Sequence, residues 1–158
     1  MNFITVIEPV FVKEFQCVGG ECRDHCCKGW GIYLDKKTIK RYKNSKNIEI
    51  KNIAIEYISI TKASQKNWGF MKLNEKGTCG FLDESGLCKV HKELGASALS
   101  HTCSSYPRSD VIYKRELHKS LTLSCPEATR QLLMNPDAMR FTEILKHQVH
   151  PNNHIDID

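Results

Sequence analysis

The stretch Cys22-Arg23-Asp24-His25-Cys26-Cys27-Lys28-Gly29-Trp30 decides the fold of this 158-residue chain, because three of its residues are cysteines. Cysteines that serve as small buried hydrophobic side chains are scattered along a sequence, whereas thiolates that share a metal occur in tight groups. The clustering therefore predicts an irregular, cysteine-rich metal-binding core. The remaining five cysteines are Cys17, Cys79, Cys88, Cys103 and Cys125.

The spacing of the cysteines points to metal ligands on a flexible loop. It is C-x4-C-x3-C-C in the first group, followed by C-x8-C, C-x14-C and C-x21-C among the last four. We predict that all eight serve metal binding, since eight is twice the ligand number of a structural zinc or of an iron–sulfur cluster. One site with spare thiols and two separate sites both remain open. Because neighbouring side chains diverge, we expect Cys26 and Cys27 to contribute unequally to any one metal.

Composition indicates one globular domain over residues 1–158, with 41% hydrophobic and 26% charged residues and a net charge of +5. The lysines and arginine of residues 36–46 are typical of a solvated helix face. We find no secretory signal and no membrane-spanning run, and expect a cytoplasmic protein without membrane or nucleic-acid partners. Disulfides do not persist in the reducing cytosol, which favours metal binding or catalysis. A secreted disulfide scaffold is the alternative.

The local patterns predict an α+β fold that is mainly helical with short strands. We expect extended structure from Phe3 to Val12, a strand over 68–73 and a pair of short strands within 111–123. Asp35 is placed to cap a helix that runs through Ile39 and Tyr42. Further helices are predicted over 48–61, over 87–94 with Gly95 closing it, over 99–103, from a Ser124–Glu127 capping box to Met134, and from Asn135 through Gln148.

Four motif blocks resemble the flagellin lysine N-methylase family. They span Phe15 to Arg130 in the family's order, and the chain resembles the broader group of CxxCxxCC zinc- or iron-chelating proteins more distantly. The blocks are Phe15-x-Cys17 with Cys22 through Ile32, Cys79-Gly80-Phe81-Leu82 with Gly86-Leu87-Cys88-Lys89-Val90-His91, Leu99-Ser100-x-Thr102-Cys103-x-x-Tyr106-Pro107-Arg108, and Leu123-Ser124-Cys125-Pro126-Glu127.

The resemblance implies methylation of lysine side chains on flagellin with S-adenosylmethionine as methyl donor and a [4Fe–4S] iron–sulfur cluster or zinc as the metal. Family members are much longer, so the chain resembles their cysteine-rich N-terminal part. No catalytic base and no S-adenosylmethionine-binding residue can be named from the sequence. We expect Trp30, Phe81, Tyr106 and Leu123 to pack around the metal site. His91 is a candidate ligand or hydrogen-bond donor, and Arg108 a candidate counter-charge.

Three functions follow from these observations. The first is an iron–sulfur methyltransferase or its metal-binding part, which we favour. The second is a zinc-stabilised binding module without catalytic activity. The third is a redox or disulfide protein that uses Cys26 and Cys27.

Overall fold

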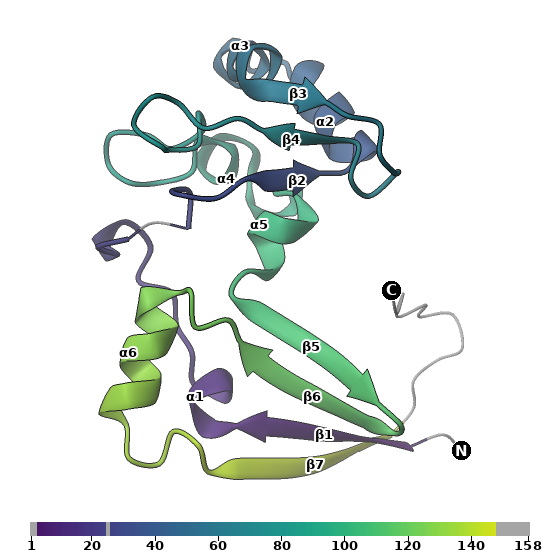
Figure 1. Ribbon diagram of the computed structural model, residues 1–158, viewed down its shortest axis with the longest axis vertical. Coiled ribbons are helices and arrows are strands. Elements are labelled where there is room, and N and C mark those ends of the chain that lie inside the picture. Colours follow the sequence, from purple (N-terminus) through teal and green to yellow (C-terminus); the bar gives the residue numbers. More distant parts are fainter. Residues whose placement is uncertain (1–2, 25, 148–158) are drawn as a thin grey trace. The chain divides into compact units, whose positions relative to one another are not determined.

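The computed structural model describes residues 3–24 and 26–147, with side chains described over 4–24 and 26–141. The chain forms two compact units (Figure 1). Unit 1 consists of Met1–Cys17 and Pro107–Asp158, and unit 2 is the continuous segment Val18–Tyr106. The single domain predicted over residues 1–158 stays a prediction.

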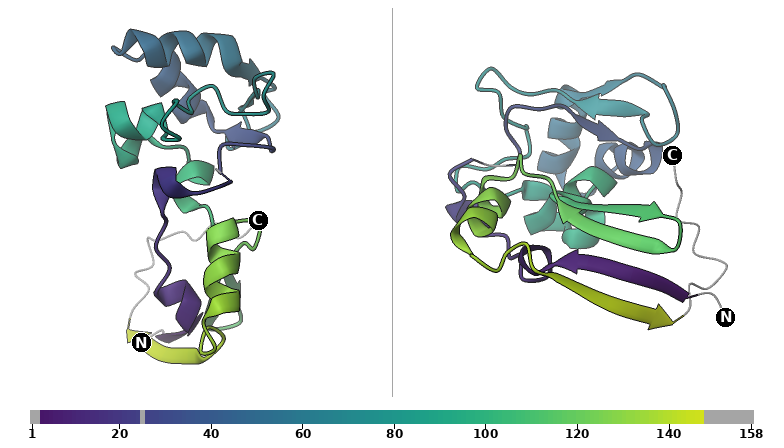
Figure 2. Two further views of the ribbon diagram at one scale, coloured as in Figure 1. Left: turned by 90° about the vertical axis from the view of Figure 1, so that its left-hand side faces the viewer. Right: turned by 60° about the horizontal axis from the view of Figure 1, so that its bottom comes forward.

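Unit 1 is built on a four-stranded mixed sheet with the order β5-β6-β1-β7, whose strands lie edge to edge in the right-hand view of Figure 2. β1 is parallel to β6 and antiparallel to β7, and β5 is antiparallel to β6. The pairing of β5 with β6 confirms the pair of strands predicted within 111–123, although β5 begins earlier, at Arg108. Lys114 adopts a φ of 57° in the turn between them. The strands are β1 (Phe3–Pro9), β5 (Arg108–Tyr113), β6 (Glu116–Leu121) and β7 (Phe141–His147).

Two helices accompany this sheet. The extended start of the chain ends at Pro9, where α1 (Val10–Lys13) begins and contacts both α6 and β6. α6 (Pro126–Met134) has Pro126 in its first turn, as predicted. The predicted capping box is wrong, because the N-cap residue is Cys125 and its side chain makes no capping hydrogen bond. Glu127 instead accepts hydrogen bonds from side chains further along α6.

The helix predicted from Asn135 is also wrong over the described residues, and Gln148 lies outside them. Residues Phe141–His147 form β7, which pairs with β1 in an unbroken antiparallel register from Phe3 opposite His147 to Pro9 opposite Phe141. The backbone hydrogen bonds of this segment therefore go to a strand from the other end of the chain. Such pairing overrides local helix propensity.

Unit 2 contains a three-stranded antiparallel sheet with the order β2-β4-β3 (Figure 1). Its strands are β2 (Ile32–Leu34), β3 (Ile58–Ile60) and β4 (Gly69–Met71). Its helices are α2 (Lys36–Lys43), α3 (Ile48–Tyr57), α4 (Lys89–Leu94), α5 (His101–Ser105) and the 3-10 turns η1 (Gly19–Glu21) and η2 (Ala96–Ala98). The buried core joins sheet and helices, and its members include Ile32, Leu34, Ile39, Tyr42, Ile50, Ala54, Ile58, Met71, Phe81 and Val90.

A capping side chain begins α2, and strand pairing ends α3. The Asp35 carboxylate accepts a hydrogen bond from the Thr38 N–H at 2.8 Å and begins α2 as predicted. α3 ends at Tyr57, short of the predicted Thr61, because residues 58–60 pair with β4 as strand β3. The β-branched residues at the end of this segment suit a strand better than a helix.

Gly95 closes α4 with a φ of 82°, as the sequence predicts. The structure is thus a mixed α+β fold, which confirms the predicted class, whereas a predominance of helix is not confirmed. Within the described residues, no helix combines the length and the apolar character that crossing a bilayer requires.

Candidate metal centre

The eight cysteines divide unevenly between the two units. All of them lie in the described part of the chain, and no disulfide joins any of them. Cys17 and Cys125 belong to unit 1. Unit 2 carries the other six, which are Cys22, Cys26, Cys27, Cys79, Cys88 and Cys103.

Backbone pairing fixes three of the cysteines in unit 2. The Cys79 N–H donates to the Cys27 carbonyl at 2.7 Å, so the first cysteine loop lies beside the second. Leu82 and Cys88 form an isolated antiparallel bridge, which turns the chain back on itself between Cys79 and α4. These contacts bring Cys27, Cys79 and Cys88 near one another.

The fourth cysteine of the group comes from α5. Ser100 is 1% exposed and caps this helix by accepting a hydrogen bond from the Cys103 N–H at 3.1 Å. Cys103 is an exposed residue of α5. It also lines a cavity of unit 2.

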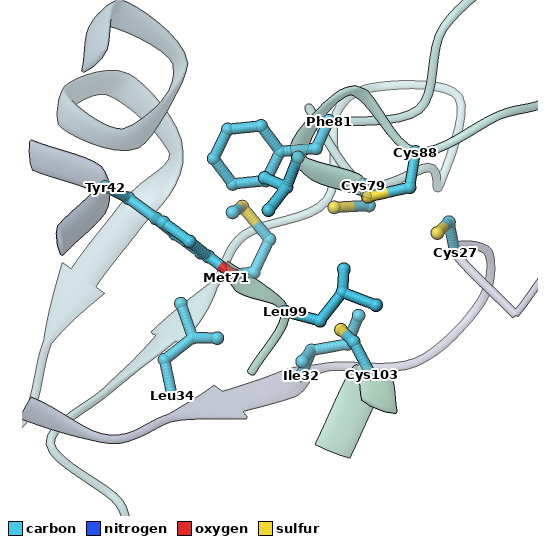
Figure 3. Close-up of a pocket in the computed structure, with 11 residues that line it drawn as sticks. Cys27, Ile32, Leu34, Tyr42, Met71, Cys79, Phe81, Cys88, Leu99 and Cys103 are labelled. Atoms are coloured by element: carbon cyan, nitrogen blue, oxygen red, sulfur yellow. The ribbon is translucent and has the colours of Figure 1, made fainter. Parts of the chain in front are cut away.

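Cys27, Cys79, Cys88 and Cys103 all line this one cavity, which has a volume of about 20 Å³ (Figure 3). A space of this size accommodates roughly one water molecule. The rest of its wall is almost wholly apolar and consists of Ile32, Leu34, Tyr42, Met71, Phe81, Val90 and Leu99. Four cysteine residues thus face one apolar space.

Hydrogen bonds between thiols shift the pKa values of Cys26, Cys27 and Cys79 differently, and the last two of these residues line the cavity. The hydrogen bond to Cys27, together with burial, raises the pKa of Cys26 above its ordinary value. The hydrogen bond with Cys26 lowers the pKa of Cys27, but the hydrogen bond with Cys79 and burial outweigh it and raise the pKa to about 12. The hydrogen bond with Cys27 lowers the pKa of Cys79. Cys79 is therefore the first of the three to become a thiolate.

Burial governs the other two thiols of the cavity. It raises the pKa of Cys88, and nearby backbone N–H groups of His91 and Val90 oppose the rise by favouring the thiolate. Burial likewise raises the pKa of Cys103, opposed by a hydrogen bond with Ser100. Metal binding at this cavity must therefore displace protons from sulfur.

The four cysteines around the cavity match a thiophilic metal by the chemistry of their donors, since thiolates suit zinc and iron. Among residues 3–24 and 26–147, no three histidine, cysteine, aspartate or glutamate side chains are spaced as ligands of one ion.

The other cysteines lie in different surroundings. The Cys22 thiol donates to the Asp24 carbonyl at 3.0 Å. Cys26 is exposed, and its carbonyl accepts a hydrogen bond from Trp30 Nε1 at 2.8 Å. Cys17 is exposed and Cys125 is buried in unit 1. That all eight cysteines bind metal stays a prediction.

The residues expected to pack around the metal fall into different places. Phe81 is buried and lines the cavity, as predicted. Trp30 and Tyr106 stack on each other with ring centroids 5.5 Å apart. The prediction for Leu123 is wrong, because this side chain is 52% exposed in unit 1.

Neither Arg108, the candidate counter-charge, nor His91, the candidate ligand or hydrogen-bond donor, lines the cavity. The Arg108 guanidinium lies over the Phe15 ring within unit 1, with its carbon 5.3 Å from the ring centre. His91 is exposed on α4. In the described structure both residues therefore have surroundings other than those the sequence predicted.

Tyr42 and Met71 line the cavity, and sequence analysis did not assign them to the site. The Tyr42 hydroxyl donates to the Ala98 carbonyl at 2.8 Å, and burial raises the pKa of Tyr42 above its usual range. The signal for Tyr42 was present in its helical spacing from Ile39, which predicts a core-facing side chain. Met71 lies within the strand predicted over 68–73, which forms as β4, but nothing in that pattern assigns its side chain to the cysteine site.

Comparison with known proteins gives close relatives. Over 144 residues, or 90% of the chain, it is 53% identical to "Lysine-N-methylase" of Salmonella typhimurium and of Salmonella choleraesuis. The chain spans only 36% of the length of these two relatives. It is 52% identical to "Flagellar biosynthetic protein FliU" of Salmonella muenchen and covers 85% of that protein.

No solved structure matches the chain. Residues 16–126 match the sequence model of the CxxCxxCC family, described as "Putative zinc- or iron-chelating domain". The matched range includes all eight cysteines and the whole of unit 2. On this match and on the similarity to the Salmonella proteins, the chain belongs to the CxxCxxCC family, together with the lysine-N-methylases and FliU.

Proposed function

We propose that this chain is the metal-binding, N-terminal part of a protein lysine N-methyltransferase that acts on flagellin. The observation that carries the proposal is the 53% identity to proteins named lysine-N-methylase, over a range that contains the thiol-lined cavity. The name of the FliU relative supports a flagellar substrate. The metal is a [4Fe–4S] cluster or zinc, and the methyl donor is S-adenosylmethionine.

The chemistry requires a neutral lysine amine. Its nitrogen lone pair forms a bond to the methyl carbon of S-adenosylmethionine while the bond from that carbon to the sulfonium sulfur breaks. The products of this step are protonated methyl-lysine and S-adenosylhomocysteine. Before the attack, the lysine ammonium must lose one proton to water or to a nearby base, and desolvation favours this loss by lowering the pKa of the ammonium.

The thiol-lined cavity has a structural role in this proposal. Its volume of about 20 Å³ is far below that of a nucleoside, so the methyl donor binds elsewhere. A bound metal supplies cross-links between loops that are far apart in the sequence and stabilises the fold around them.

The test is a chimera. In the Salmonella typhimurium lysine-N-methylase, the matched segment is replaced by this chain, and flagellin is incubated with S-adenosylmethionine and either the chimera or this chain alone. Mass spectrometry of flagellin lysines should find methylation with the chimera and not with the chain alone. A folded, metal-loaded chimera without activity contradicts the proposal. Methylation by the 158-residue chain alone contradicts its being only part of the enzyme.

A zinc-stabilised binding module is the second candidate, because the four cysteines that line the cavity equal the ligand number of a structural zinc site. Anaerobic purification separates the two metals. A brown protein with iron and sulfide supports the cluster, and a colourless protein with one zinc supports the module when the chimera is also inactive.

A further inference from the structure

We propose that the basic surface of α2, together with a groove at the C-terminal end of this helix, is a docking surface of unit 2 for an acidic segment of a protein partner. The partner is defined by its chemistry, which is a run of aspartate or glutamate side chains. The inference goes beyond the proposed function, because docking here requires neither a metal nor methyl transfer. The basic surface consists of Lys36, Lys37, Lys40, Arg41, Lys43 and Lys46.

The first argument is the concentration of charge. Residues 36–46 contain six lysine and arginine residues and no aspartate or glutamate. Their six positive charges exceed the net charge of +5 of the whole chain, so the rest of the chain is close to neutral. A patch of one sign attracts a partner of the opposite sign and raises the rate at which the two associate.

The second argument is that this arrangement is unfavourable for the helix itself. Residues three or four positions apart are neighbours on a helix, so Lys37 lies beside both Lys40 and Arg41, and like charges at this spacing are destabilising. Lys36 and Lys37 also occupy the first turn of α2, where the helix dipole disfavours cations. An exposed helix face that only has to be solvated is better served by charges of both signs.

The third argument is the lack of an internal counter-charge. Over the side chains described in 4–24 and 26–141, no ion pair joins any cation of the basic surface to a carboxylate. Elsewhere in unit 2, Lys89 pairs with Glu49. Lys36 instead lies over the Trp68 ring, with its Nζ atom 4.3 Å from the ring centre. The charge of the basic surface is therefore available to an external anion.

The fourth argument is the groove, which has a volume of about 520 Å³. The Arg41 Nη1 atom donates to the Ser97 carbonyl at 2.9 Å, which holds the guanidinium at the wall. A guanidinium in a fixed position can bind a carboxylate through two parallel hydrogen bonds. The described lining has amide, hydroxyl and short apolar side chains that suit a peptide, and it has no aromatic ring on which a nucleic-acid base could stack. It consists of Arg41, Asn44, Ser45, Leu94, Ser97 and Ala98.

The experiment measures the binding of a fluorescently labelled poly-glutamate peptide to the full chain by fluorescence anisotropy. We expect binding that weakens as the salt concentration rises to about 0.5 M, because salt screens exposed charges. A neutral glycine–serine peptide should not bind. Absence of poly-glutamate binding overturns the proposal. Tighter binding of duplex DNA of the same total charge also overturns it, since the surface would then belong to a nucleic-acid partner.

Matched charge reversals locate the docking surface. Lys37→Glu combined with Lys40→Glu should weaken poly-glutamate binding by about 10-fold or more. Lys72→Glu combined with Lys76→Glu makes the same charge change at exposed positions of unit 2 and should weaken it by less than about threefold. Arg41→Lys keeps the charge but loses the planar fork, and it should weaken binding by about threefold. Equal losses from the two double variants overturn the proposal, because the attraction would then be that of net charge alone.

Thermal unfolding separates lost binding from lost folding. Lys37→Glu removes two like-charge contacts and places an acidic residue in the first turn of α2, so the variant should melt no lower than the unaltered chain. A folded Lys37→Glu chain that binds poly-glutamate less tightly supports the proposal. A folded variant that binds it as tightly as the unaltered chain overturns it. Neither outcome bears on methyl transfer, which the chimera tests separately.

Discussion

Unit 1 and unit 2 are stabilised in different ways. Unit 1 rests on strands of six or seven residues and on a carboxylate, Glu127, that pairs with Arg130 and Gln131 within α6. Unit 2 has strands of three residues, and isolated bridges and single hydrogen bonds hold much of its cysteine-bearing chain. Short ladders stabilise little by themselves. The difference indicates that unit 2, beyond its buried core, depends more on contacts between its cysteine-bearing loops than unit 1 does on its two cysteines.

Removal of the metal should produce the largest difference in stability between unit 2 and unit 1. We expect strong chelation, or Cys79→Ser, to unfold or loosen unit 2, because the free energy of binding a structural metal is largely free energy of folding. Trp30 and Trp68 are the two tryptophans of the chain and both belong to unit 2, so tryptophan fluorescence reports this unit selectively. Hydrogen exchange in β1 and β6 should stay slow, and Cys125→Ser is the matched control. Equal loss of protection in both units contradicts the comparison.

Alkaline pH should destabilise unit 2 in its metal-free form. Folding raises the pKa of Cys27 from 9.0 to about 12 and raises those of Cys26, Cys88 and Cys103, so the folded state keeps protons that the unfolded chain loses. This contribution is complete below pH 9.0 and falls as the pH rises towards 12. The pKa of Cys79 is lowered by folding, which favours the folded state at higher pH, but this is one thiol against the four whose pKa values are raised.

Urea unfolding followed by tryptophan fluorescence at pH 8 and pH 10 measures this effect. The midpoint should fall at the higher pH, and Cys27→Ala should reduce the fall. A midpoint that rises with pH, or a dependence unchanged in Cys27→Ala, is evidence against the thiol origin.

Gly80→Ala should cost unit 2 about 1–3 kcal/mol, because overpacking strains a closed core. Its new Cβ atom lies 2.9 Å from Tyr57 Cδ2 and 3.1 Å from Ile53 Cγ2 on α3. Gly31→Ala is the control, since its Cβ meets nothing within 4 Å. Thermal unfolding followed by fluorescence compares the two variants, and equal melting temperatures contradict tight packing beside Cys79.

Glu127→Gln should have the smallest effect on stability, and only unit 1 should be affected. Hydrogen bonds from Arg130 and Gln131 lower the pKa of Glu127 from 4.5 to about 2, so this stabilisation is present above pH 4.5 and is lost as the pH falls through 2. We expect slightly faster hydrogen exchange in α6 at pH 7 and a weaker acid dependence. Asp137→Asn is the control, because its pair with Arg140 is exposed. A change in the metal affinity of unit 2 with either variant contradicts the separation.

The parts of the fold that local chemistry determines were predictable. Asp35 and Gly95 mark the ends of α2 and α4, because a cap depends on residues three or four positions away. β7 was not predictable, since its hydrogen-bond partners lie in β1 at the other end of the chain. The end of α3 was misjudged for the same reason, as residues 58–60 pair with β4.

In the candidate site, too, local sequence patterns were informative and long-range contacts were not predictable. Clustering identifies cysteines as a group, yet spacing does not say which sulfurs meet. The pairing of Cys79 with Cys27 depends on two loops that only the folded unit brings together. Tyr42 and Met71 enter the cavity wall through core packing and carry no metal-ligand signature.

The interruption of unit 1 by unit 2 has a consequence for synthesis on the ribosome. All of unit 2 has been translated once Tyr106 is added, whereas β1 has no partner until β6 and then β7 have been made. Domains generally fold as units while the chain grows, and pairing between distant strands is slow. Unit 2 therefore completes its fold, and under the proposed function captures its metal, before the sheet of unit 1 closes, while β1 waits without a strand partner.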